Sequence, residues 1–132
     1  MTSKELAIRL AAVTVDHKGL ELRILDLRSI GAFTDFFVLA SGTSDRHVRT
    51  LASAVADAGR ALGQRPLGVE GQERARWVLV DFGDVIVHLF QQEVREYYSL
   101  ERLWGEAETL ELPSEPEVGT RDGASEKAAP GG

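Results

Sequence analysis

Two apolar runs joined by a glycine-containing turn constrain the fold of this chain most strongly. Residues 77–81 and 84–90 are rich in valine and aromatic side chains and are connected across Phe82-Gly83. Gly83 can supply the positive φ of a tight turn, so the pattern predicts a β-hairpin. With a loop of two or four residues, the register pairs Trp77 with His88, Leu79 with Ile86 and Asp81 with Asp84.

Alternation of side chains along a strand divides this predicted hairpin into two unlike faces. One face is wholly aliphatic and is expected in the core: Val78, Val80, Val85, Val87 and Leu89. The other combines large aromatic with titratable side chains, as a partially exposed recognition surface does: Trp77, Leu79, Asp81, Asp84, Ile86, His88 and Phe90. A three-residue loop would shift the register by one and mix the two sets.

Helices and strands alternate through the rest of the first 104 residues. Apolar spacing predicts one helix from Ser3, as N-cap, to about His17, and a second that follows Gly42-Thr43-Ser44 and ends at Gly63. Further strands are expected at 20–27, 35–41 and 66–70, and short helical segments within 93–104. The order α-β-β-α-β-β-β-α predicts an α/β fold: a single domain with a mixed sheet of about five strands flanked by helices.

Charge is distributed unevenly along the chain. The 132 residues include 15 Lys+Arg and 21 Asp+Glu, a net charge of −6. Residues 1–104 hold 13 basic and 14 acidic side chains, whereas residues 105–132 hold 2 and 7, together with three of the four prolines. We therefore predict a nearly neutral domain over 1–104 and a disordered acidic tail over 105–132. Deletion of 106–132 is expected to leave the fold and its binding intact.

Several classes of protein are disfavoured by composition. The absence of cysteine removes disulfides, thiolate metal sites and cysteine nucleophiles. Apolar runs are far shorter than the roughly 20 residues that cross a bilayer, and the N-terminus has no signal-peptide pattern. The three histidines show no metal-ligand spacing. A cytoplasmic protein without a membrane partner, metal, cofactor or catalytic residue is expected.

The start of the second helix is a candidate anion site. Thr43 and Ser44 stand at a strand-to-helix junction, and Arg46 and Arg49 follow, so amide groups and cations could hold a phosphate. The alternative is an ordinary helix start with Thr43 or Ser44 as N-cap. The sequence is neither a Walker loop nor a dinucleotide fingerprint, and Asp45 would oppose an anion. The ordinary helix start is favoured.

Two further features of the hairpin have a functional and a structural interpretation. Asp81 and Asp84 could hold a metal as a carboxylate pair, but their spacing at a turn is more typical of a solvated loop. His88 could act as a base, but a histidine among apolar neighbours is more often a hydrogen-bonded structural or interface residue. No nucleophile accompanies it, so the structural or interface interpretation is favoured.

Aromatic residues and arginine are concentrated at the end of the predicted domain. These residue types dominate binding energetics at interfaces, so the cluster indicates a docking surface. The alternative is a terminal helix that packs back on the sheet, and both interpretations remain open. The cluster comprises Arg95, Tyr97, Tyr98, Leu100, Arg102, Leu103 and Trp104.

Several motifs together resemble the ribosomal silencing factor, or Iojap-like, family. They are Thr34-Asp35-Phe36-Phe37-Val38, Ser41 to Val48, Pro66 to Gly71, Trp77 to Asp81 and Gly83 to His88, followed by Arg95, Tyr98, Leu100, Glu101 and Leu103-Trp104. The resemblance covers about residues 3–104 in order and spacing. It implies a nucleotidyltransferase-like fold without transferase activity.

The same resemblance implies a function in translation. A family member binds the large ribosomal subunit through large-subunit ribosomal protein fourteen and sterically blocks joining of the small subunit, which represses translation when nutrients are limiting. Homodimers of the free factor are also implied. Direct sequence-specific nucleic-acid binding is not expected. Residue type and strand parity give a predicted docking patch: Glu70, Trp77, His88, Phe90, Arg95, Tyr98, Leu100 and Trp104.

Two other functions compete with this interpretation. A small nucleotidyltransferase or nucleotide-binding protein would use the Gly42-Thr43-Ser44 loop for phosphate and Asp81 with Asp84 for magnesium. An RNA-binding module would need a basic face, which only Arg46, Arg49, Arg60, Arg74 and Arg76 offer, and acidic residues interrupt it.

Overall fold

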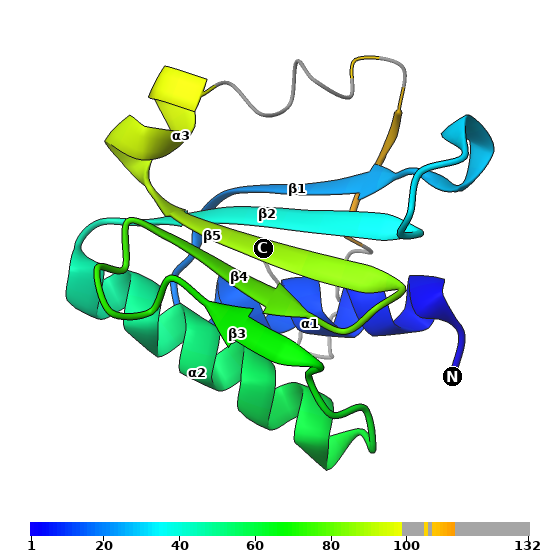
Figure 1. The fold of residues 1–132 in the computed structure, drawn as a ribbon, viewed down its shortest axis with the longest axis horizontal. Coiled ribbons are helices and arrows are strands. Elements are labelled where there is room, and N and C mark those ends of the chain that lie inside the picture. Colours follow the sequence, from blue (N-terminus) through cyan, green and yellow to red (C-terminus); the bar gives the residue numbers. More distant parts are fainter. Residues whose placement is uncertain (99–104, 106, 113–132) are drawn as a thin grey trace, which may run out of the picture.

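One sheet organises the part of the chain that the structure describes, residues 1–98, 105 and 107–112 of a computed structural model (Figure 1). Its strands are β1 (Leu20–Asp26), β2 (Phe36–Gly42), β3 (Gly68–Glu70), β4 (Trp77–Asp81), β5 (Val85–Gln91) and β6 (Glu108–Leu110). The helices are α1 (Ser3–Asp16), α2 (Asp45–Ala61) and α3 (Gln92–Tyr98), with a 3₁₀ turn, η1 (Arg28–Ile30).

The sheet is mixed, with the strand order β3-β4-β5-β2-β1-β6. The central pair β2 and β5 is parallel, and the other neighbouring pairs are antiparallel. The predicted α/β class is therefore confirmed. Strand β6 was not predicted: it pairs with β1 from within the segment assigned to the tail, which raises the strand number from about five to six. Residues 113–132 of that segment lie outside the described residues.

Helices α1 and α2 lie against the same side of the sheet (Figure 1). Helix α1 begins one residue earlier than predicted, because Thr2 forms a capping box with Glu5. The hydroxyl of Ser3, the predicted N-cap, instead donates to Asp35 Oδ2 at 2.8 Å. Among the described residues, no helix has the length and apolarity of a membrane span.

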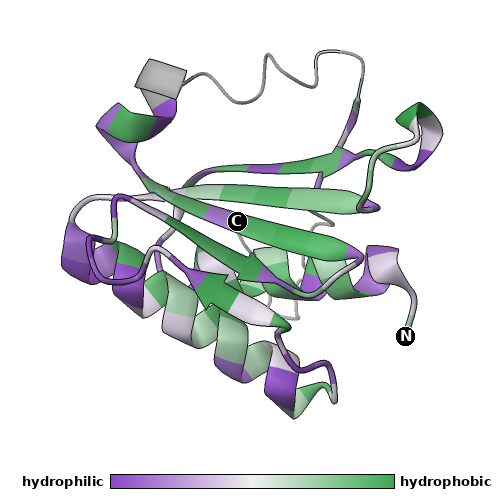
Figure 2. Ribbon diagram, in the orientation of Figure 1, coloured by the Kyte–Doolittle hydropathy of each residue, from purple (hydrophilic) through white to green (hydrophobic). Residues whose placement is uncertain are grey.

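The side of the sheet under α1 and α2, here the first face, carries the main core. All five aliphatic residues predicted for the core side of the hairpin are fully buried there, as the prediction required. They pack against Leu51, Val55 and Leu10 of the helices. The apolar colouring of the central strands in Figure 2 follows this arrangement.

The hairpin register differs from the predicted one by two residues. Trp77 lies opposite Phe90, Leu79 opposite His88 and Asp81 opposite Ile86. The turn closes differently because the Phe82 amide donates to the Val85 carbonyl, and the Gly83 amide donates to Asp81 Oδ1 at 2.7 Å. A shift of two residues preserves parity, so each side chain stays on its predicted face.

Candidate functional site

The opposite side of the sheet, here the second face, has a different composition. Its buried hydrophobic residues are Leu25, Leu27, Phe37, Leu39, Ile86, Phe90 and Val94, and Trp77 and Leu79 pack against them while half-buried. Helix α3 contributes Val94 to this cluster. The second face is thus an apolar surface rich in aromatic rings.

Five aromatic rings of the second face contact one another in series. We call them the aromatic cluster: Phe33, Phe37, Trp77, His88 and Phe90. The Phe37 and His88 ring centroids are 4.4 Å apart in an edge-to-face arrangement. The His88 ring is 6.0 Å from Phe90 and 6.1 Å from Trp77. Phe33 lies 6.4 Å from Phe37 and is 77% exposed, so the series runs from the interior to the surface.

His88 is the polar centre of the aromatic cluster. The Trp77 indole Nε1–H donates to His88 Nδ1 at 3.1 Å, which places the ring proton on Nε2. Among the described residues His88 Nε2 has no hydrogen-bond partner, and burial lowers the pKa of His88 to about 4. His88 is therefore neutral near pH 7 and acts as a fixed acceptor for Trp77.

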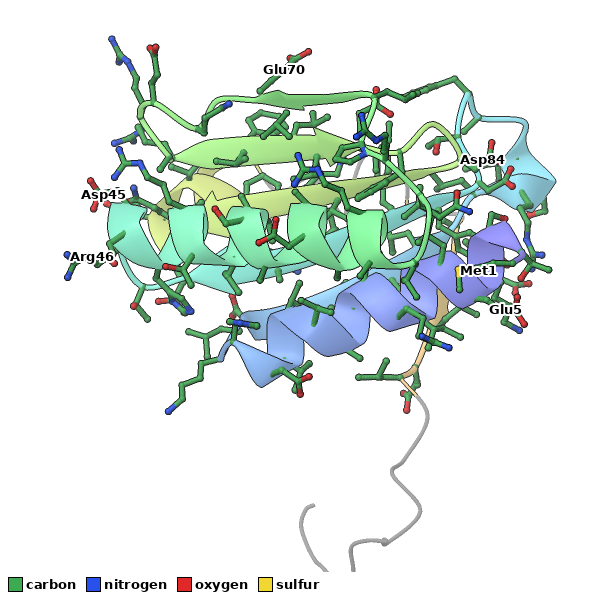
Figure 3. All side chains as sticks on the ribbon, turned by 90° about the horizontal axis from the view of Figure 1, so that it is seen from below. Met1, Glu5, Asp45, Arg46, Glu70 and Asp84 are labelled. Carbon is green, nitrogen blue, oxygen red and sulfur yellow. The ribbon has the colours of Figure 1, made fainter. Side chains whose placement is uncertain are left out.

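The eight residues of the predicted docking patch fall into three groups. Glu70 is exposed on the edge strand β3, where its side chain points away from the sheet (Figure 3), and Trp77 is half-buried. His88, Phe90 and Arg95 are buried, contrary to the partial exposure that the sequence suggested for this face. The side chain of Tyr98 and the whole of Leu100 and Trp104 lie outside the described residues.

Arg95 has a structural contact that its sequence pattern did not reveal. Its Nη1 donates to Ser41 Oγ at 3.0 Å, and both residues are buried. The contact joins α3 to β2 and holds the Arg95 guanidinium in a buried position against β2. Arg95 therefore supports this face from within and is not displayed on its surface.

Phe33 and Phe37 are the members of the aromatic cluster that sequence reasoning missed. Phe37 sits beside Ile86 on the parallel neighbour strand, a pairing that hairpin parity cannot supply. Phe33 precedes β2 in the connection after η1. An aromatic residue in a turn next to Thr34-Asp35-Phe36-Phe37 was the available signal for it.

Three backbone amides of the candidate anion site at the start of α2 donate to acceptors within the chain. Ser44 is the N-cap, and its Oγ accepts from the His47 amide at 3.1 Å. The Thr43 amide donates to His47 Nδ1 at 3.0 Å, and the Arg46 amide donates to Asp45 Oδ1 at 2.8 Å. This geometry agrees with the predicted ordinary helix start, with Ser44 as N-cap.

The two arginines of that candidate site point to different surroundings. Arg49 Nε donates to the Gln72 carbonyl at 3.0 Å, Arg49 Nη2 donates to the Glu73 carbonyl, and Nη1 pairs with Asp45 at 3.5 Å. Arg46 is exposed beside Asp45 at the end of the helix (Figure 3). Arg49 thus holds a loop of its own chain.

The carboxylate pair considered for magnesium does not form a metal site among the described residues. Asp81 accepts the Gly83 amide and so closes the hairpin turn. No group of three metal-ligating side chains occurs in the described ranges. Asp84 lies at the other end of the molecule from Asp45 and the start of α2 (Figure 3), so the two halves of a nucleotide site are not brought together.

Comparison with known families supports one of the interpretations drawn from the sequence. The family model described as "Ribosomal silencing factor during starvation" matches residues 1–131. The chain belongs to the ribosomal silencing factor family, RsfS. A factor of this name from Halalkalibacterium halodurans is 41% identical over 113 residues, which is 85% of this chain and 96% of that protein. The RsfS of Bacillus subtilis is 38% identical over 85% of this chain and 95% of its own length.

Solved structures agree with the family assignment. A crystal structure of a Chromobacterium violaceum protein superposes with a TM-score of 0.77 at 36% identity and covers 80% of this chain and 88% of that one.

The chloroplastic protein Iojap of Zea mays is a more distant relative by sequence, 31% identical over 81% of this chain and 46% of its own length. The predicted resemblance is confirmed, and translation regulation and ribosome association follow from the family.

Proposed function

We propose that this protein binds the large ribosomal subunit through large-subunit ribosomal protein fourteen and blocks joining of the small subunit. Membership of the RsfS family supports the proposal, together with a second face that combines aromatic rings with a neutral, buried histidine. The mechanism is steric. A domain of about one hundred residues spans roughly 25 to 30 Å, enough to keep an opposing subunit from the surface it covers.

Trp77 is the central anchor of the proposed docking surface. Large half-buried aromatic side chains provide much of the binding energy at interfaces because they exclude water over a wide area. The hydrogen bond to His88 and the contact with Phe90, at 5.3 Å between ring centroids, fix the indole before the partner arrives. A fixed side chain loses less conformational entropy on binding.

Phe33 and Glu70 extend this surface in opposite directions. Phe33 is 77% exposed at the end of the aromatic cluster, where its ring is available for contact. Glu70 is an exposed carboxylate on β3, at the sheet edge beyond β4, and can set the register of a basic partner. Phe90, His88 and Arg95 hold the surface from below.

No transferase chemistry is included in this proposal. The amides at the start of α2 are used within the chain, and Asp81 serves the hairpin turn. A nucleotidyltransferase would require magnesium-dependent nucleotide binding. Calorimetric titration with a nucleoside triphosphate and magnesium is expected to give no heat of binding, whereas saturable binding would favour the enzyme.

The direct test of partner choice uses isolated components. Tagged protein is mixed with purified large-subunit ribosomal protein fourteen, and separately with purified large and small subunits on sucrose gradients. We expect capture of the isolated protein and co-sedimentation with the large subunit alone. Co-sedimentation without capture of the isolated protein would reject this partner, and failure of both would reject the proposed function.

A further inference from the structure

Arg74 and Arg76 are two exposed arginines on the loop that leads into β4. Two other exposed arginines pair with acids: Arg28 pairs with Asp26 at 2.8 Å, and Arg60 pairs with Asp57 at 3.1 Å. No hydrogen bond or ion pair of the Arg74 or Arg76 side chain occurs among the described residues. Their charge is thus available to a partner.

The residue between them explains why both point outward. Ala75 is fully buried in the core of the first face although its φ of 55° is in the left-handed region. Such a backbone costs on the order of 1 kcal/mol for a residue with a Cβ, and surrounding contacts must hold it. Burial of the central methyl group leaves the two flanking side chains exposed to solvent.

Several hydrogen bonds fix this loop. The Ala75 amide donates to the Gly71 carbonyl at 2.9 Å, and the Ala75 carbonyl accepts from Gln91 Nε2 at 3.1 Å. Arg49 holds the Gln72 and Glu73 carbonyls from α2. The arginine pair is therefore carried on a defined backbone, which lowers the entropy lost when a ligand binds.

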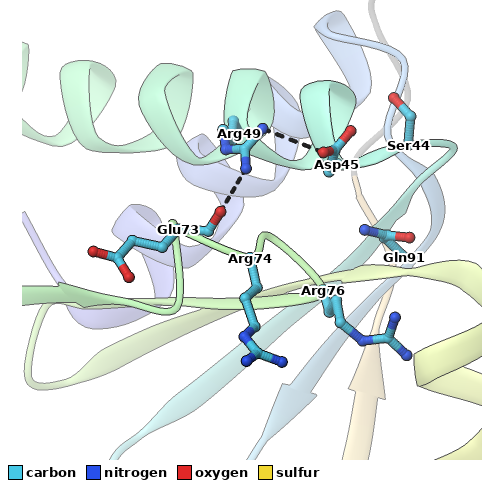
Figure 4. A pocket seen from close by; sticks show the side chains of 7 residues that line it. All are labelled: Ser44, Asp45, Arg49, Glu73, Arg74, Arg76 and Gln91. Carbon is cyan, nitrogen blue, oxygen red and sulfur yellow. Dashed lines mark hydrogen bonds and ion pairs between the residues drawn. The ribbon is translucent and has the colours of Figure 1, made fainter.

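The pair immediately precedes the anchor of the proposed docking surface in the sequence. In Figure 4 Arg74 and Arg76 both extend away from α2, and the Glu73 carboxylate points elsewhere. Asp45, the other nearby acid, is paired with Arg49. Arg76 directly precedes Trp77, so the pair borders the anchor of the second face.

We propose that Arg74 and Arg76 bind the phosphate backbone of RNA at the margin of the protein-docking surface. This inference rests on the proposed function, because a factor seated on a ribosomal protein meets RNA around it. Guanidinium groups form two parallel hydrogen bonds with phosphate, which suits them to this contact. Contacts to the backbone position a protein without reading sequence.

Salt dependence of binding tests the proposal with the full chain. Affinity for purified large subunits is measured from 0.05 to 0.5 M KCl for the wild type, for Arg74→Gln/Arg76→Gln, and for a matched control, Arg9→Gln/Arg65→Gln. The control removes the same charge from two exposed arginines elsewhere on α1 and after α2. Circular dichroism verifies folding of each variant.

The expected result is a change in slope that is specific to the pair. Loss of two phosphate contacts makes the negative slope of log affinity against log salt shallower by about 1.5. This change corresponds to roughly thirty-fold weaker binding at 0.1 M salt, and the difference from wild type decreases as the salt concentration rises. The control keeps the wild-type slope. Capture of isolated ribosomal protein fourteen is unchanged in both variants.

Three outcomes would overturn the inference. An unchanged slope in Arg74→Gln/Arg76→Gln, with wild-type binding intact, rejects the RNA contact and leaves the proposed function standing. An equal fall in capture of the isolated protein would show that the arginines bind protein. Absence of wild-type binding to the large subunit would reject the proposed function and this inference with it.

Discussion

The two faces of the sheet are built from the same strands but differ in composition and in exposure to solvent. On the first face, aliphatic side chains from β4 and β5 are covered by α1 and α2 and are fully buried. On the second face, Trp77, His88 and Phe90 of those strands join Phe33 and Phe37 in the aromatic cluster, which reaches the surface at Phe33 and Trp77.

This difference suggests that the first face mainly determines stability and the second face mainly determines binding. The aliphatic side chains of the first-face core do not titrate, so their packing does not itself depend on pH. The second face contains a buried histidine whose neutral form is required. We therefore expect substitutions on the first face to change stability, and substitutions on the second face to change binding or pH dependence.

The largest expected effect is on the first face. Leu51 of α2 is fully buried in the main core, and Leu51→Ala leaves a cavity there. The free energy of unfolding, measured by urea denaturation, should fall by about 2 to 5 kcal/mol. Leu67→Ala, at a leucine that is 75% exposed, serves as the control and should change it by less than about 0.5 kcal/mol.

The second prediction concerns pH and isolates His88. Its pKa of about 4 in the folded chain lies below the ordinary value of 6.5, so between these values the unfolded chain binds an additional proton. Stability should fall as pH is lowered from 6.5 to 4, by about 3 kcal/mol in total, and this contribution should then level off.

His88→Asn provides the comparison for that pH profile. Asparagine can still accept from the Trp77 indole but does not titrate, and His17 and His47 remain in both proteins. The difference between the two profiles therefore belongs to His88. Parallel profiles between pH 4 and 6.5 would contradict a buried neutral histidine.

The third prediction concerns binding through the second face. Trp77→Ala should weaken binding to the large subunit by about 2 kcal/mol, roughly thirty-fold, with the fold retained by circular dichroism. Val15→Ala, at an exposed apolar residue on α1, is the control and should bind as the wild type does. Wild-type affinity in Trp77→Ala would remove this residue from the docking surface.

The smallest effect is expected at the C-terminal strand. Leu110 and Leu112 are partly buried against the first-face core, so truncation after residue 106 should cost about 1 to 2 kcal/mol in the free energy of unfolding. Truncation after residue 112 should leave stability and subunit binding unchanged, because the removed segment is acidic and rich in proline and glycine. Equal stability of the two truncated proteins would show that β6 adds nothing.

Strand parity explains why most of the fold was predictable from sequence. The hairpin register was wrong by two residues, but both faces were assigned correctly because side chains alternate with a period of two. The continuously apolar run at 35–41 likewise predicted a strand buried on both sides, as β2 is. Strand β6 escaped prediction because three residues in an acidic context carry too weak a pattern.

The candidate site was less predictable because its properties depend on contacts distant in sequence. Sequence could suggest that His88 and Arg95 face a partner, but their burial results from packing against Phe37 on β2 and a hydrogen bond to Ser41. Arg49 was predicted as a candidate anion ligand, but it donates to the carbonyls of residues 72 and 73, which only the tertiary fold brings near it. Such pairings have no local signature.

Subunit joining tests the central claim most directly. Purified large and small subunits are mixed at a magnesium concentration that favours joining, with and without a saturating amount of the protein, and are separated on a sucrose gradient. We expect the protein to migrate with the large subunit and the peak of joined ribosomes to fall. An undiminished peak of joined ribosomes at saturation would contradict the account.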